Sequence, residues 1–265
     1  MTGALATAVS WLFVPATKPE RFTKATASGA DVVIIDLEDA VAAADKAAAR
    51  AALRAHWPPD PPVPVVVRIN AIGTPEAADD LALCRELSPA AVVVPKAESA
   101  EDLRAVGGPV LPLIESARGL VNLAEIAGAE PVVRLLFGSI DLALDLGVTD
   151  DAALGPARSD LVRWSVVSSL PAPVDGVTTA IRDTEAVTSD AAHAKGWGFG
   201  GKLCIHPVQI PLVHAAFAPS AEEVAWARRV LAVGLEGAAS VDGEMIDRPV
   251  VERARRIVRE AERAG

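Results

Sequence analysis

The chain has few cysteines and no long apolar segment. Its two cysteines, Cys84 and Cys204, are too few for a disulfide framework or a four-cysteine zinc site. Both lie among apolar residues, so we expect buried free thiols. No apolar run approaches the roughly 18 residues of a membrane-spanning helix, and the first ten residues lack the basic region of a secretory signal. These absences favour a cytoplasmic protein that does not span a membrane.

Basic clusters are also missing. The formal net charge of the 265 residues is −10, and no stretch rich in lysine or arginine stands out. General nucleic-acid binding is therefore disfavoured, because it depends on a basic surface that neutralises phosphates. An anionic substrate would need a local basic pocket or a metal ion. The hydrophobic fraction of 51% excludes a disordered chain.

Short apolar runs recur along the chain, and each ends in polar residues or in glycine and proline. Most are rich in β-branched residues and apolar on both faces, which is typical of strands buried in a parallel sheet. Segments rich in alanine, leucine, arginine and glutamate separate them and have helical character. We expect eight strands, at residues 11–14, 31–37, 63–69, 90–94, 110–114, 132–137, 173–177 and 202–205.

This alternation predicts an α/β protein, a (β/α)8 TIM barrel. An open nucleotide-binding sheet would need a glycine-rich turn after the first strand, and residues 15–18 contain none. We predict a catalytic barrel domain over residues 1–220. Two further helical stretches, residues 221–235 and 249–263, are not needed to close a barrel. They form a predicted C-terminal extension over residues 221–265 that either caps the barrel or packs on a neighbouring subunit.

Charged side chains follow the predicted strands at their carboxyl ends, where barrel enzymes build their sites. Glu115 and Asp141 follow two neighbouring strands. Two carboxylates with room for water and substrate suit Mg²⁺. Alternatively, each carboxylate caps the helix that follows it. The spacing of the two residues leaves both interpretations open.

Three further side chains at these strand ends have two interpretations each. Arg68 can bind a substrate carboxylate through two hydrogen bonds, or it can pair with Asp36 or Glu38 on the neighbouring strand. Lys96 is interpreted as an ion-pair partner rather than a Schiff-base nucleophile, since the nucleophile would need a lowered pKa. His206 is expected to cap the end of the last strand rather than to transfer protons.

Eight motifs resemble, in chain order, the citrate lyase beta-subunit-like branch of the HpcH/HpaI aldolase and citrate lyase family, which includes malyl-CoA and citramalyl-CoA lyases. The resemblance implies a (β/α)8 barrel that binds Mg²⁺ through Glu115 and Asp141. It also places Arg68 on the substrate carboxylate and Gly138 in the substrate site. The motifs are LFVPATKPERF, DVVIIDLEDAV, VVVRIN, VVVPKAES, LPLIESARGL, LLFGSIDLALDLG, CIHPVQI and GEMIDRPV.

The GEMIDRPV motif matches a segment that carries the catalytic acid/base aspartate of the CoA-lyase members, which assigns this role to Asp247. That aspartate tends to serve the adjacent subunit, so the resemblance implies a homotrimer or hexamer. Alternatively, Asp247 caps the last helix. Lys18 and Arg21 are the candidates for CoA contacts, or else belong to a solvated helix start. Asp39 follows Glu38 where pyruvate-class aldolases have histidine, which favours an acyl-CoA substrate.

The expected reaction is Mg²⁺-dependent cleavage, or formation, of a 3-hydroxyacyl-CoA such as malyl-CoA, citramalyl-CoA or citryl-CoA. The products would be an acyl-CoA and a 2-keto acid: glyoxylate, pyruvate or oxaloacetate. Arg68 would anchor the substrate, Asp247 would move a proton at the thioester carbon, and Glu38 would support Arg68 or metal-bound water. Alternatives are a metal-dependent aldolase for free acids, a malate synthase or thioesterase variant, and a non-catalytic metabolite-binding subunit. An acyl carrier protein instead of CoA is a further open alternative.

Overall fold

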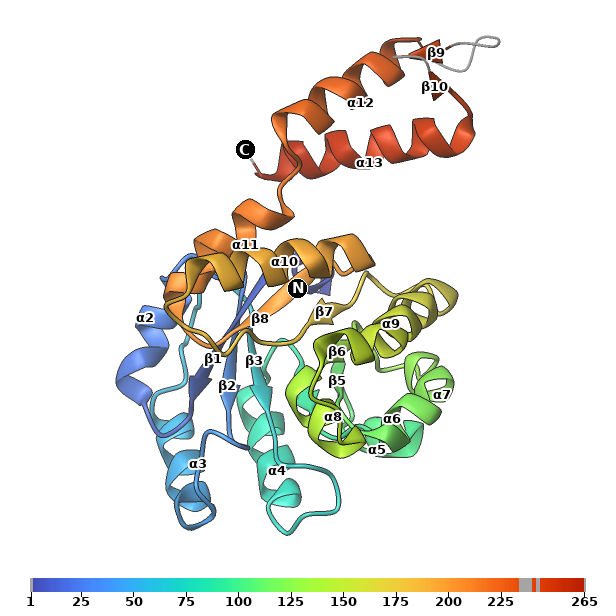
Figure 1. The fold of residues 1–265 in the computed structure, drawn as a ribbon. Coiled ribbons are helices and arrows are strands. Elements are labelled where there is room, and N and C mark those ends of the chain that lie inside the picture. Colours follow the sequence, from blue (N-terminus) through green and yellow to red (C-terminus); the bar gives the residue numbers. More distant parts are fainter. Residues whose placement is uncertain (1, 234–239, 242–243, 265) are drawn as a thin grey trace. The chain divides into compact units, whose positions relative to one another are not determined.

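The computed structural model describes residues 2–233, 240–241 and 244–264 and contains two compact units, residues 1–214 and 215–265 (Figure 1). Each unit has its own cluster of buried apolar side chains. The helix α11 (Ile210–Phe217) crosses the division between the units. The first unit ends at His214, and the predicted domains over residues 1–220 and 221–265 stay a prediction.

Eight parallel strands close into a barrel in the first unit, and Figure 1 shows helices arranged around them. Each strand pairs with the next one along the chain, and β1 pairs with β8 to complete the closure. The predicted (β/α)8 fold is confirmed, and every predicted strand overlaps an observed one. The strands are β1 (Ser10–Pro15), β2 (Val32–Asp36), β3 (Val65–Arg68), β4 (Val92–Val94), β5 (Val110–Ile114), β6 (Leu136–Phe137), β7 (Val174–Asp175) and β8 (Gly201–Cys204).

The helices of the barrel unit are short. Within the described residues, no helix is both long and apolar enough to cross a membrane. Ser99 caps α5, and Asp183 caps α10. The helical elements are α1 (Thr2–Thr7), η1 (Pro19–Arg21), α2 (Phe22–Thr26), η2 (Ala43–Asp45), α3 (Lys46–Ala55), α4 (Ala77–Leu87), α5 (Ala100–Ala105), α6 (Ala117–Val121), α7 (Leu123–Ala127), α8 (Ser139–Leu146), η3 (Asp151–Leu154), α9 (Gly155–Val167), α10 (Thr184–Trp197), η4 (Pro207–Gln209) and α11.

The strands are buried on both faces, because side chains fill the barrel and helices cover it. Every residue of β2 and β5 is buried, which explains their continuous apolar sequences. Cys84 and Cys204 are both buried and free, as expected. Polar residues therefore appear where the strands end, and Asp36 and Arg68 are the last residues of β2 and β3.

At the amino-terminal end of the strands, a buried arginine connects three segments. Arg134 is 1% exposed. Its Nη1 donates to the carbonyl groups of Leu5 (2.9 Å) and Ala8 (2.7 Å), and its Nε donates to that of Ala172 (2.7 Å). The guanidinium also lies 5.6 Å from the ring centroid of Trp11. These bonds fix α1, a helix that the sequence analysis did not expect, against the barrel.

The second unit is a pair of helices joined by a short antiparallel ladder. The helices α12 (Ala221–Val233) and α13 (Arg248–Ala264) correspond to the predicted C-terminal stretches. The strands β9 (Ser240–Val241) and β10 (Glu244–Met245) pair with each other. The buried residues of this unit are Ala227, Val230, Ile246, Val251, Ala254 and Ile257. Packing of the extension on a neighbouring subunit stays a prediction.

We expect Arg134→Met to lower the free energy of unfolding by about 2–4 kcal/mol, because buried carbonyl groups would lose their donors. Urea denaturation of the purified protein measures this. Arg182→Met is the matched control, since Arg182 is exposed, and it should change stability by less than about 0.5 kcal/mol. Equal losses in the two variants would contradict the role assigned to Arg134.

Candidate active site

An ion pair between the ends of two neighbouring strands forms the centre of the candidate site. The register of β2 and β3 places Asp36 beside Arg68. Arg68 Nε and Nη2 donate to the two carboxylate oxygens of Asp36 at 2.7 and 2.6 Å. Arg68 Nη1 lies 3.0 Å from Glu38 Oε2. The pairing that the sequence left open as an alternative to substrate binding is therefore present, and it holds the guanidinium in one orientation.

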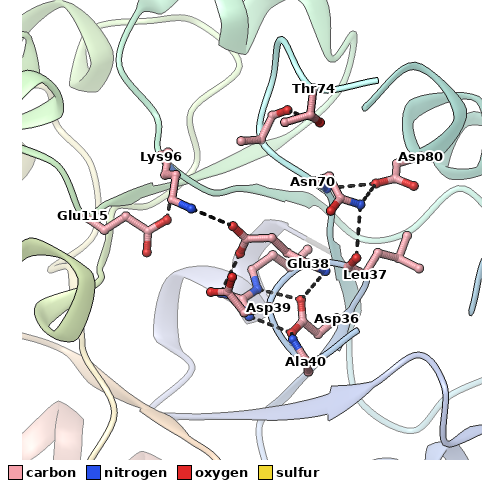
Figure 2. Close-up of polar contacts among 12 residues, drawn as sticks. Asp36, Leu37, Glu38, Asp39, Ala40, Asn70, Thr74, Asp80, Lys96 and Glu115 are labelled. Carbon is pink, nitrogen blue, oxygen red and sulfur yellow. Dashed lines mark hydrogen bonds and ion pairs between the residues drawn. The ribbon is translucent and has the colours of Figure 1, made fainter. Parts of the chain in front are cut away.

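Asp36 also fixes the loop that carries Glu38 (Figure 2). Its Oδ1 accepts a hydrogen bond from the Glu38 amide at 2.9 Å, and its Oδ2 accepts one from the Ala40 amide at 3.0 Å. The ammonium of Lys46 donates to the carbonyl groups of Leu37 (2.8 Å) and Glu38 (2.7 Å). Asp36 binds amide groups of the loop and Lys46 binds its carbonyl groups, so these hydrogen bonds fix the backbone of Glu38.

A second chain of hydrogen bonds reaches the same loop from α4. Asp80 is fully buried, and its Oδ2 accepts hydrogen bonds from the backbone amide (2.9 Å) and side-chain Nδ2 (2.6 Å) of Asn70. The Nδ2 group also lies 3.1 Å from the Leu37 carbonyl oxygen, and Arg50 donates to Asp80 Oδ1 at 3.0 Å. Sequence reasoning missed both Asp80 and Lys46. In the sequence, each is an ordinary charged residue of a helical segment.

Lys96 lies between two glutamates, as Figure 2 shows. Its backbone amide donates to Glu115 Oε1 at 2.8 Å, and its Nζ lies 3.5 Å from Glu38 Oε1. Its backbone is in the left-handed region, with φ of +47°. Burial lowers the pKa of the Lys96 ammonium, but Glu38, Asp39 and Glu115 outweigh it and raise the pKa overall. This agrees with the ion-pair interpretation rather than with a Schiff-base nucleophile.

Glu115 and Asp141 lie near one another, together with Gly138. Glu115 follows β5 and is 3% exposed, and Asp141 is in the first turn of α8. The Gly138 amide donates to the Ile114 carbonyl at 2.9 Å, so the segments that follow β5 and β6 lie side by side. A Cβ atom at Gly138 would lie 2.4 Å from Glu115 Cβ and 2.5 Å from its Oε2, so a side chain does not fit there.

The carboxyl groups of this site are short of positive charge. Burial, Glu38 and Asp141 raise the pKa of Glu115 to about 8 against the opposing effects of the Lys96 amide and Arg68. Burial is also the main reason that the pKa of Glu38 is raised to about 7, despite the nearby Arg68. In the described chain Glu38 Oε2 is buried without a hydrogen bond of good geometry. Such a site favours the arrival of a cation.

The available ligands fit a magnesium ion better than a zinc ion. No group of three or more His, Cys, Asp or Glu side chains forms a ready-made metal cage within the described ranges. Magnesium uses one or two carboxylates and completes its octahedron with water and substrate oxygens, whereas structural zinc sites need four protein ligands. Glu115 and Asp141 would offer two hard oxygen ligands, the number of carboxylates that a magnesium site uses.

The other predicted residues lie in several places. Lys18 and Arg21 are exposed and follow β1, so they are at the same end of the barrel as Glu115. Asp247 is in the second unit, where its Oδ1 accepts a hydrogen bond from the Val250 amide at 3.1 Å and caps α13. His206 caps η4, the helix after β8, rather than the strand itself, by accepting a hydrogen bond from the Val208 amide at 3.2 Å.

A closed barrel with buried carboxylates, an arginine and a lysine at the carboxyl ends of its strands defines a class of protein. It is a barrel enzyme whose site is suited to a divalent cation and a small anionic ligand. Comparison with known proteins gives the family. The model of the HpcH/HpaI aldolase/citrate lyase family matches residues 9–207.

Curated proteins and solved structures agree with this match. A citrate lyase subunit beta-like protein of Mycobacterium tuberculosis is 44% identical over 95% of this chain and 94% of its own length. A (3S)-malyl-CoA thioesterase of Cereibacter sphaeroides is 34% identical over 96% of this chain and 94% of its length. The crystal structure of CitE from M. tuberculosis with magnesium, acetoacetate and coenzyme A is 42% identical, has a TM-score of 0.88, and covers 97% of this chain and 99% of its own.

The chain belongs to the HpcH/HpaI aldolase/citrate lyase family. The resemblance read from the eight motifs is therefore confirmed, and so is the expectation of an enzyme of the citrate lyase beta-subunit-like class. Magnesium, the metal expected from the motifs, is present in the CitE structure. The roles of the individual site residues stay predictions.

We expect the metal-free protein to lose stability as pH rises from about 5 to 9. The folded-state pKa values of Glu38 (about 7) and Glu115 (about 8) are raised, so their contribution is full below the unfolded value near 4.5 and is lost as each ionises in the fold. Glu115→Gln should reduce this loss by about 1–3 kcal/mol in urea denaturation. Glu101→Gln, at an exposed position, should leave the pH profile unchanged. The same profile for wild type and Glu115→Gln would contradict the raised pKa.

Proposed function

We propose that the protein catalyses Mg²⁺-dependent cleavage, or the reverse formation, of a 3-hydroxyacyl-CoA thioester. The substrate class includes malyl-CoA, citramalyl-CoA and citryl-CoA, and the products are an acyl-CoA and a 2-oxo acid. The observation that carries this proposal is the buried carboxylate of Glu115 and the half-buried carboxylate of Asp141, with the fixed guanidinium of Arg68 at the same end of the barrel. The related CitE structure with magnesium, acetoacetate and coenzyme A supports it.

Glu115 and Asp141 would hold the magnesium ion. When bound, the ion acts as a Lewis acid for the oxygen atoms of the hydroxy-acid or oxo-acid part of the substrate. Gly138 leaves the space that Glu115 occupies, so the metal ligand and the substrate can lie close to the backbone there. The Lys96 amide orients Glu115 through its 2.8 Å hydrogen bond.

Arg68 would bind the carboxylate end of the substrate, and Glu38 would support Arg68. Asp36 holds two sides of the guanidinium, so Arg68 offers a positive charge of fixed position with no reorganisation when the substrate binds. Glu38, 3.0 Å from Arg68 Nη1, supports that position and can accept a hydrogen bond from a water molecule in the site. Such preorganised charge is a large contribution to catalysis in buried sites.

Asp247 would move the proton at the carbon atom next to the thioester. In cleavage it protonates the enolate carbon of the departing acyl-CoA, and in formation it removes that proton. Asp247 is exposed and belongs to the helical extension. In our proposal a homotrimer or hexamer brings it to the barrel of a neighbouring copy. Lys18 and Arg21 would contact the phosphates of CoA, or of the prosthetic group of an acyl carrier protein.

A thioesterase is a second candidate, because the C. sphaeroides relative bears the name (3S)-malyl-CoA thioesterase. Hydrolysis of malyl-CoA releases free CoA and malate, whereas cleavage of its carbon–carbon bond gives acetyl-CoA and glyoxylate. Titration of the thiol product, together with mass spectrometry of the acids, separates the two reactions. The same assay with free hydroxy-keto acids tests the aldolase alternative.

We expect Glu115→Gln and Asp141→Asn each to lower Mg²⁺-dependent turnover by at least about a hundredfold, because each loses a charged metal ligand. Steady-state kinetics with a panel of acyl-CoA substrates, with and without EDTA, measures this. Asp145→Asn is the matched control, because Asp145 is on the same helix, α8, and bonds the Ala117 amide instead. Wild-type rates in Glu115→Gln would overturn the metal assignment.

We also expect Asp247→Asn to abolish exchange of the acetyl-CoA methyl protons in deuterated water while the protein stays folded. The amide keeps an oxygen that can accept the hydrogen bond from the Val250 amide, so the cap of α13 can persist. NMR of the methyl signal measures the exchange, and circular dichroism checks the fold. Unchanged exchange would remove Asp247 from the mechanism.

A further inference from the structure

The two cations of the site differ in how many of their donors are already used. Arg68 is 9% exposed, and three of its N–H groups face Asp36 and Glu38 at 3.0 Å or less. The side chain of Lys96 is 49% exposed. Its ammonium has one contact in the described chain, at 3.5 Å from Glu38 Oε1, which is long for a charged hydrogen bond. Lys96 therefore retains donors for a ligand.

The charges around the site also favour a further cation, besides the proposed metal, for an anionic ligand. Arg68 is paired with Asp36 and Glu38, and Asp39 Oδ2 lies 3.7 Å from its Nη1. A ligand carboxylate at this guanidinium would therefore meet three protein carboxylates. The half-exposed ammonium of Lys96, near the other oxygen of Glu38, would help the metal to offset this repulsion. Opposite charges a few ångströms apart attract strongly in a partly buried site.

The backbone of Lys96 points to a function at this position. A non-glycine residue at φ of +47° is in the left-handed region, which costs about 1 kcal/mol or more for a residue with a side chain. Glycine would adopt this conformation without that cost, but it would supply no ammonium. The conformation directs the amide of Lys96 to Glu115 and its side chain to Glu38.

We propose that Lys96 is a substrate-binding residue whose ammonium leaves Glu38 and binds the carboxylate of the 2-oxo acid part of the substrate. This proposal rests on the proposed function for the identity of the ligand. It separates two tasks within one residue. The backbone amide of Lys96 positions Glu115, whereas the side chain binds the ligand.

Lys96→Gly tests this separation, because it keeps the backbone amide, tolerates the backbone conformation and removes the side chain with its ammonium. With magnesium present, calorimetry should show the Kd of oxaloacetate or pyruvate raised about tenfold to a hundredfold, as expected for a lost charged hydrogen bond. Mg²⁺ affinity measured without the acid should stay within about twofold, because the Lys96 amide still bonds Glu115. Lys96→Arg should retain most of the binding of the acid, and ethylammonium should restore part of it to Lys96→Gly.

Ser88→Gly is the matched control for the backbone change. Ser88 is exposed, ends α4 and has φ of +53°. It should bind both magnesium and the acid as the wild type does. In kinetics, Lys96→Gly should raise the KM of the thioester substrate more than it lowers kcat, because the contact is made with the bound substrate.

Three outcomes would overturn the proposal. In the first, the wild type cleaves thioesters and Lys96→Gly binds the acid as tightly as the wild type does. The role of Lys96 is then wrong, and the proposed function stands. If Lys96→Gly loses Mg²⁺ affinity and acid binding equally, the residue only positions Glu115. If the wild type neither cleaves thioesters nor binds a 2-oxo acid, the proposed function fails, and the role of Lys96 fails with it.

Discussion

The candidate site depends on the ion pair between Asp36 and Arg68. Parallel pairing of β2 and β3 puts the two residues in register, so the fold alone brings the carboxylate and the guanidinium together. The same carboxylate accepts hydrogen bonds from the amides of Glu38 and Ala40 and so shapes the loop that follows β2. Loss of this one interaction would release both a cation and the glutamate beside it. Pairs of this kind, once buried, are costly to break.

Around that pair, the carboxylates outnumber the cations, and this excess of negative charge determines what the site can bind. Burial would normally favour neutral carboxyl groups, which is why the pKa values of Glu38 and Glu115 are raised. A divalent cation changes this balance, because it stabilises both ionised groups at once. The site is thus arranged for a metal and an anionic ligand to bind together, since the metal offsets the repulsion that the ligand would meet.

The sequence was sufficient to predict the barrel and to predict which residues follow neighbouring strands. The apolar runs are continuous because both faces of each strand are covered, so their positions could be recognised without knowledge of packing. The contacts that support the site are different in kind. Asp80 and Asp79 are adjacent acids of one helix, yet one is fully buried against Asn70 and the other is exposed. Only the tertiary packing of α4 distinguishes them.

The same limit applies to the amino-terminal end of the barrel. Arg134 is inside a predicted strand, where an arginine ordinarily marks a solvent-facing position, and nothing local indicates that its partners are carbonyl groups far along the chain. The cap of α10, Asp183, is a smaller example of the same limit. Asp183 and Thr184 are both good capping residues, and the choice between them depends on the backbone of the preceding loop.

Gly138 has no functional group, but the space above its Cα is occupied by the Glu115 side chain. Even a methyl group at this position would push that carboxylate away from the strand ends. Gly138, which takes no part in any reaction, thereby determines where the Glu115 carboxylate can lie. A search for inactive members of this family should therefore inspect the glycine between β6 and α8 as well as the residues at the positions of Glu115 and Asp141.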